Sequence, residues 1–159
     1  YEGIVCFNTY LGNSITKISA NYKNWISSNL NNDDLNVRAL MARTNRILNL
    51  SECNAYQAPF PSKDYKIALK ELPRAFPLSE DINGFEICLN SVKWWKNNKL
   101  KYGLVLGGGK DPLVTIDKLN ILSKLVATDG NTHLINAAGH FLPEWGMEFG
   151  KELFEHLDG

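Results

Sequence analysis

Long apolar runs and an excess of charge of one sign are both missing from this sequence. No stretch approaches the roughly 20 apolar residues that a helix needs to cross a bilayer, and no charged start leads into an apolar segment as in a signal peptide. The 17 Lys and Arg residues balance the 17 Asp and Glu residues, so no general field attracts nucleic acid or anionic lipid. We therefore expect neither a nucleic-acid partner nor a membrane partner.

Cysteines and clustered metal ligands are also scarce. Cys6, Cys53 and Cys88 lie far apart, without a C-x-x-C pair. This favours reduced packing cysteines in a cytoplasmic protein over one disulfide and a leftover thiol. The three histidines are not spaced as metal ligands, and no H-E-x-x-H motif occurs. We expect no metal site.

The patterns that are present alternate between strand and helix. Short apolar runs predict strands at residues 3–8, 103–106 and about 132–136. Helical spacing of apolar residues predicts helices at about 14–28, 33–42, 51–56, 63–74, 79–97, 115–126 and 142–157. A strand followed by a helix and a second strand is the order of elements typical of a parallel sheet. The sequence therefore predicts an α/β fold with about three parallel strands and flanking helices.

The helical stretch between the first two strands resembles an inserted lid. We predict a partial α/β core from residues 1–14 and 99–159, interrupted by a helical cap at residues 15–98. An apolar run begins at Ile4, almost directly after Tyr1, whereas natural chain starts are usually ragged and polar. We therefore expect the sequence to enter the fold at an internal strand.

Two chemically useful side chains follow successive predicted strands. Asp111 comes after the strand that ends in the turn Gly107–Gly109, and His140 comes after the next strand. Ligands of parallel sheets bind beyond the carboxyl ends of the strands, where the two side chains can meet. A carboxylate beside an imidazole fixes its tautomer and stabilises the imidazolium that forms when the ring takes a proton. Taken singly, Asp111 is typical of a turn and His140 of a helix cap; together they predict an acid–base pair.

Several segments resemble known motifs. Residues 109–113 (GKDPL) and 138–144 (AGHFLPE) are similar to the acid and histidine motifs of α/β-hydrolase-fold enzymes. Residues 56–61 (YQAPFP), followed by Tyr65 and then by Leu72 and Pro73, are similar to the cap region of haloalkane dehalogenases. The ordered series covers essentially the whole chain, which therefore resembles the C-terminal portion of a haloalkane dehalogenase: the last strands of an α/β-hydrolase fold with its inserted helical cap.

The resemblance implies hydrolysis of a carbon–halogen bond in two steps, without a cofactor. In such enzymes an aspartate displaces the halide to form an alkyl-enzyme ester, and water activated by the histidine hydrolyses that ester. His140 would be the base and Asp111 its orienting acid. Trp25 best matches the cap tryptophan that donates to the leaving halide, with a helix-face core residue as the alternative. Ordinary core packing is likewise the alternative for the implied apolar pocket positions, which are Tyr22, Leu72, Pro73, Phe76, Leu113 and Val114.

The chain also departs from the family pattern. The nucleophile of the family lies on a sharp elbow, G-x-D-x-G or G-x-S-x-G, before the strand at residues 3–8, and nothing here matches it. One branch of the family has its acid after that strand, but Asn8 is not acidic, which favours Asp111. We expect a catalytically incomplete chain that binds a small halogenated or other apolar organic substrate and a halide ion. The open edge of the first strand favours a homodimer or a swapped assembly.

Two other functions stay open. An epoxide or ester hydrolase of the same fold would use tyrosine donors from the cap, so Tyr56 or Tyr65 would matter more than Trp25. The other alternative is a folded, non-catalytic fragment or interaction module.

Overall fold

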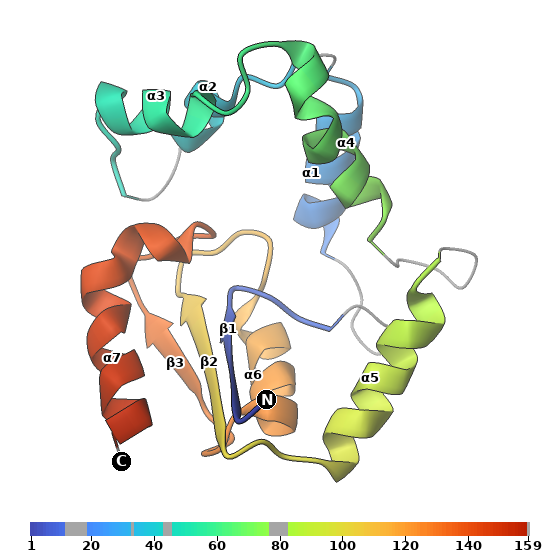
Figure 1. Cartoon of the computed structure of the whole chain (residues 1–159), viewed down its shortest axis with the longest axis vertical. Helices are drawn as coiled ribbons and strands as arrows, with labels where there is room; N and C mark the ends of the chain where they lie inside the picture. The colour runs from blue at the N-terminus through green and yellow to red at the C-terminus, as the bar shows by residue number, and fades with distance from the viewer. Residues whose placement is uncertain (12–18, 33, 43–45, 77–82, 159) are drawn as a thin grey trace.

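The sheet of this protein matches the predicted architecture. The computed structural model describes residues 1–11, 19–32, 34–42, 46–76 and 83–158. Within them, three parallel strands lie in the order β1 (Gly3–Phe7), β2 (Tyr102–Gly108) and β3 (Thr132–Ile135). Helices flank this sheet, and a further group of helices lies beyond the carboxyl ends of its strands (Figure 1). The α/β fold class predicted from the sequence is thus confirmed.

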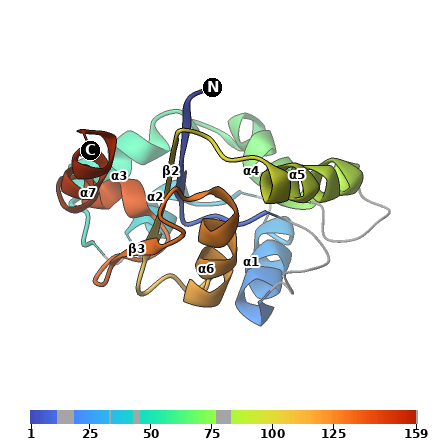
Figure 2. The same ribbon diagram turned by 90° about the horizontal axis from the view of Figure 1, so that it is seen from below.

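Side chains of the strands alternate between two apolar clusters on opposite faces of the sheet. Cys6 and Val105 pack with apolar residues of α6 (Ile116–Val126), and Leu104 and Leu106 pack on the side of α7 (Gly146–Asp158). The two helices lie on either side of the strands in Figures 1 and 2. Because successive residues of a strand point to opposite faces, the continuous apolar run of β2 serves both clusters.

The helical group has a small core of its own. Among the described residues it comprises α1 (Ala20–Leu30), α2 (Val37–Met41), α3 (Leu50–Gln57), the 3₁₀ turn η1 (Lys63–Lys66) and α4 (Ile67–Arg74). Buried Val37, Met41, Leu48 and Cys53 form its centre, and Phe141 packs against them. Phe141 belongs to the loop after β3, so this cluster joins the helical group to the sheet.

Polar contacts fasten the start of α1 to the loop after β2. Ser19 Oγ lies 3.4 Å from the Leu113 carbonyl oxygen, and Asn21 Nδ2 donates to the Pro112 carbonyl at 3.2 Å. Ser19 also caps α1, because its Oγ accepts from the backbone N–H of Tyr22. One end of the helical group is thereby tied to the segment that follows Asp111.

A second attachment centres on Glu144, in the 3₁₀ turn η2 (Leu142–Trp145). Its carboxylate accepts from Arg46 Nη2 at 2.7 Å and from the Tyr56 hydroxyl. Arg46 Nη2 also donates to Glu52 at 2.8 Å, and this hydrogen bond is the main reason that the pKa of Glu52 is lowered. The helical group is therefore attached at two places: to the loop after β2 through α1, and to η2 directly after the loop that carries His140.

Helix boundaries follow capping residues more than apolar spacing. The helix predicted from residue 33 begins only at Val37, since Asn36 accepts from the Ala39 N–H as its N-cap. The helix predicted from residue 79 begins at Phe85, directly after Gly84, whose φ is 94°. The predicted starts at 14, 33 and 79 lie outside the described residues.

Other sequence expectations can be compared with the described residues. Among the described residues Cys6 and Cys53 are buried and Cys88 is half-buried, each as a free cysteine, and their reduced state stays a prediction. In the described part of the chain, no helix is long and apolar enough to cross a membrane. β1 lies at one edge of the sheet. Self-association through that edge stays a prediction, which sedimentation at micromolar concentration tests.

The turns after β2 and β3 approach more closely than side chains would allow. A Cβ atom on Gly108 would lie 2.3 Å from the Gly139 carbonyl oxygen and 2.6 Å from that of Ala138. The Lys110 N–H donates to the same Ala138 carbonyl at 2.9 Å. Contact with neighbouring backbone therefore requires glycine at position 108.

We predict that Gly108→Ala lowers the free energy of unfolding by about 2 to 4 kcal/mol, because the methyl group displaces backbone that cannot rotate away. Gly150→Ala in α7 is the matched control, since a Cβ there meets no neighbouring atom within 4 Å. Alanine is favoured over glycine inside helices, so we expect the control to be unchanged or slightly stabilised. Chemical denaturation measures both variants. Equal losses in the two would contradict the prediction.

Candidate active site

The Asp111 carboxylate is buried and held from two sides. Its side chain has no exposed surface (0%) and follows the turn after β2. One oxygen, Oδ1, accepts from the backbone N–H groups of Leu113 at 2.7 Å and Val114 at 3.1 Å. The other oxygen is left to face the loop after β3. Backbone geometry thus fixes the direction in which Asp111 can accept a further hydrogen bond.

That further partner is His140. Its Nδ1 lies 2.9 Å from Asp111 Oδ2, so the structure brings the two predicted residues together. An ionised carboxylate only accepts, and the neutral ring in this contact therefore carries its proton on Nδ1. Among the described residues no group binds Nε2, and about a third of the side chain (34%) is exposed. The geometry leaves Nε2 available to take a proton.

Asn8 ties the strand ends together at this point. It follows β1, is 6% exposed and has a φ of 39°, in the left-handed region that asparagine tolerates. Its Oδ1 accepts from the Gly108 N–H at 2.7 Å, and its Nδ2 donates to the carbonyls of Gly139 and His140, both at 2.8 Å. Sequence reasoning considered Asn8 only as a missing acid. The available signal was a polar amide directly after a buried strand.

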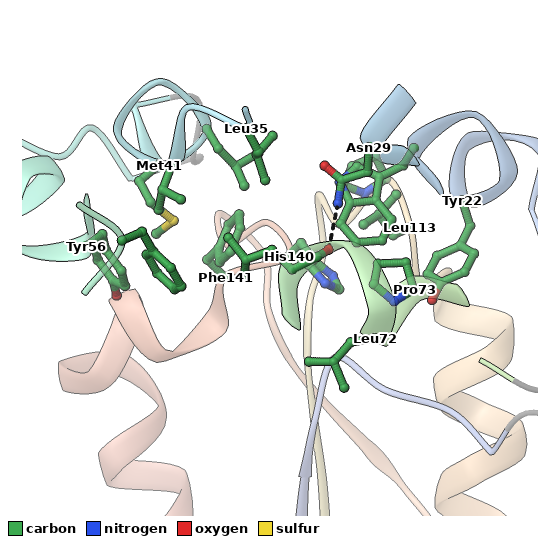
Figure 3. A pocket seen from close by; sticks show the side chains of 16 residues that line it. Tyr22, Asn29, Leu35, Met41, Tyr56, Leu72, Pro73, Leu113, His140 and Phe141 are labelled. Carbon is green, nitrogen blue, oxygen red and sulfur yellow. Dashed lines mark hydrogen bonds between the residues drawn. The ribbon is translucent and has the colours of Figure 1, made fainter. Parts of the chain in front are cut away.

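A large cavity opens above the exposed side of the His140 ring. Its volume is about 590 Å³, and its walls come from α1 to α4 and from the loops after β2 and β3 (Figure 3). Such a position, beyond the carboxyl ends of parallel strands, is where α/β proteins bind ligands. The cavity therefore needs both the sheet and the helical group.

Most of the predicted pocket residues line this cavity, and two do not. Those in the lining are Tyr22, Leu72, Pro73 and Leu113, and the predicted halide donor Trp25 lies there too. Phe76 lies outside the described lining and packs on Tyr10 and Tyr22, with ring centroids 5.7 and 5.4 Å apart. Val114 is buried in the cluster that contains α6. Their side chains support the wall from behind.

Several lining residues were not predicted from the sequence. They are Asn29, Leu35, Val37, Leu40, Met41, Phe60, Leu69, Pro112 and Phe141. Val37, Leu40 and Met41 occur at i, i+3 and i+4, which is typical of a buried helix face. That spacing could have marked them as buried, but it cannot distinguish a core contact from a cavity wall.

Few polar groups reach this apolar cavity. The Trp25 ring lies 5.8 Å from that of Tyr22, and its indole N–H has no acceptor among the described residues. Burial raises the pKa of the Tyr22 hydroxyl, and the hydrogen bond to Glu144 raises the pKa of Tyr56. Both phenols therefore stay neutral at physiological pH. The site combines one available imidazole nitrogen with an indole donor in an apolar enclosure.

Known proteins resemble this chain over part of their length. No family model matches it. A curated haloalkane dehalogenase from Mycobacterium marinum is 28% identical over 107 residues, which are 64% of this chain and 33% of that protein. The tetrameric structure of haloalkane dehalogenase DpaA from Paraglaciecola agarilytica NO2 matches with a TM-score of 0.85 and 25% identity, covering 95% of this chain and 50% of that one. The resemblance seen in the sequence is thereby confirmed: this chain is similar, in sequence and in its α/β-hydrolase fold, to part of a haloalkane dehalogenase.

Proposed function

We propose that this chain provides the acid–base pair, the halide donor and most of the substrate cavity for a haloalkane-dehalogenase-type hydrolysis. One observation carries the proposal: His140 is anchored through Nδ1 to the buried Asp111, while its ring lines a large apolar cavity. A water activated there attacks the carbonyl carbon of an alkyl-enzyme ester. The alcohol leaves and the carboxylate is restored.

His140 and Asp111 have separate roles in this step. His140 Nε2 takes a proton from the water as the new carbon–oxygen bond forms, and the imidazolium later returns it to the leaving alkoxide. Asp111 stabilises the imidazolium without taking the proton itself. The full burial of the Asp111 side chain strengthens this electrostatic contribution, since little solvent screens the carboxylate.

Trp25 is proposed as the halide donor. An indole N–H donates and accepts nothing, so it suits an anion held inside apolar walls. Trp25 lies on α1, in the lining of the cavity that also contains His140. A volume of about 590 Å³ lies within the range of small-molecule sites, in keeping with a small halogenated organic substrate.

The attacking carboxylate is proposed to come from outside the described residues. The described lining contains no carboxylate, thiol or aliphatic hydroxyl that could displace a halide. We therefore expect no turnover by this chain alone. A 1-bromobutane hydrolysis assay tests this, and turnover that disappears in His140→Gln would contradict it.

The tyrosine alternative has less support from the geometry. An epoxide or ester hydrolase would aim cap tyrosines at the substrate oxygen. The Tyr56 hydroxyl is engaged by Glu144, and Tyr65 lies on η1 with 63% exposure, outside the described lining. Trp25, by contrast, offers a donor without a partner among the described residues.

Bromide titration of the tryptophan fluorescence tests the proposed donor. We predict a saturable quenching component in the parent chain and its loss in Trp25→Phe, because bound bromide contacts the indole. Trp94→Phe is the matched control, since Trp94 is 48% exposed on α5 (Phe85–Asn97) and can contribute only collisional quenching. A saturable component that survives Trp25→Phe would rule out Trp25 as the donor.

A further inference from the structure

Pro73 leaves one carbonyl of α4 without its helical donor. A proline inside a helix has no N–H to give to the carbonyl four residues earlier, which here is that of Leu69. Asn29 of α1 replaces the lost donor, with its Nδ2 lying 3.4 Å from the Leu69 oxygen. Because a part-buried carbonyl without a donor is unfavourable, this contact fixes which end of the Asn29 amide faces α4.

The other end of that amide is turned toward the cavity. Asn29 is 6% exposed and belongs to the lining. Figure 3 shows its Nδ2 in the hydrogen bond and its oxygen on the opposite side, toward Leu35. Among the described residues no donor reaches this oxygen. An acceptor held in place by Pro73 thus stands in a wall made mostly of apolar side chains.

We infer that Asn29 is a specificity-determining residue that accepts a hydrogen bond from the substrate. The substrates it selects are halogenated compounds with a hydroxyl or N–H group, such as haloalkanols, in preference to plain haloalkanes. This inference rests on the proposed function for the halogen end of the substrate. A plain haloalkane would bury the Asn29 oxygen unpaired, whereas a hydroxyl would satisfy it.

The spacing of Trp25 and Asn29 fits one short bifunctional ligand. The two residues are four positions apart on α1, about 6 Å along its axis, and both line the cavity. Residues at i and i+4 share one face of a helix. A halogen at the Trp25 indole and a hydroxyl at Asn29 can therefore be joined by a chain of several carbons.

Ligand binding to the full chain tests this inference. Dissociation constants are measured by NMR titration for 1-chlorohexane, 6-chlorohexan-1-ol and hexan-1-ol. We expect Asn29→Leu to weaken both alcohols about three- to tenfold and to leave 1-chlorohexane unchanged or tighter, because the lost interaction is one neutral hydrogen bond. Asn24→Leu, at an exposed position of the same helix, is the matched control and should change none of the three.

The outcomes separate this inference from the proposed function. Alcohols that bind Asn29→Leu as tightly as the parent would overturn the role of Asn29, even if bromide still quenches Trp25. Loss of the alcohols with no bromide response would support Asn29 and contradict the halide site. If Asn29→Leu fails to fold, Pro73→Ala restores an N–H for the Leu69 carbonyl. The double variant is then compared with Pro73→Ala alone. Weaker alcohol binding in the double variant is expected, by less than three- to tenfold because the Leu69 carbonyl no longer orients Asn29, and equal binding would overturn the inference.

Discussion

The close approach of the turns after β2 and β3 is the constraint on which the site depends. Gly108 lets the backbone at residues 138–139 come within a distance that excludes any side chain, and Asn8 bonds to both turns. This packing places the Asp111 carboxylate beside the His140 ring. The geometry of the Asp111–His140 pair therefore depends on the ends of all three strands.

The cavity depends on a second set of contacts, those between the sheet and the helical group. Phe141 packs into the core of the helices directly after His140, and Glu144 then binds Arg46 and Tyr56. The same short segment thus carries His140 and anchors the wall of the cavity above it. On the opposite side, α1 carries Trp25 and Asn29 into the cavity and is tied to the loop after Asp111. The segments that carry His140, Trp25 and Asn29 are therefore also the ones that hold the cavity together.

The sequence was sufficient for the fold and for part of the site. Apolar runs and helical spacing predicted the three strands and the helices between them. The positions of Asp111 and His140 directly after two strands predicted that their side chains would meet. Asn8 and Asn29 were missed because their importance comes from partners distant in the chain: two neighbouring turns for Asn8, and a carbonyl freed by Pro73 for Asn29. Phe76 and Val114 show the same limit, since spacing does not tell whether an apolar residue faces a cavity or lies behind its wall.

The proposed chemistry depends on which nitrogen of the His140 ring carries the proton. If Asp111 orients His140 for base chemistry, the neutral ring carries its proton on Nδ1 and leaves Nε2 free. Nitrogen-15 NMR of the imidazole above its titration range measures this directly, with His140→Gln used to assign the signals. The account predicts a neutral His140 protonated at Nδ1, with an unprotonated Nε2. A neutral His140 protonated at Nε2 would contradict it.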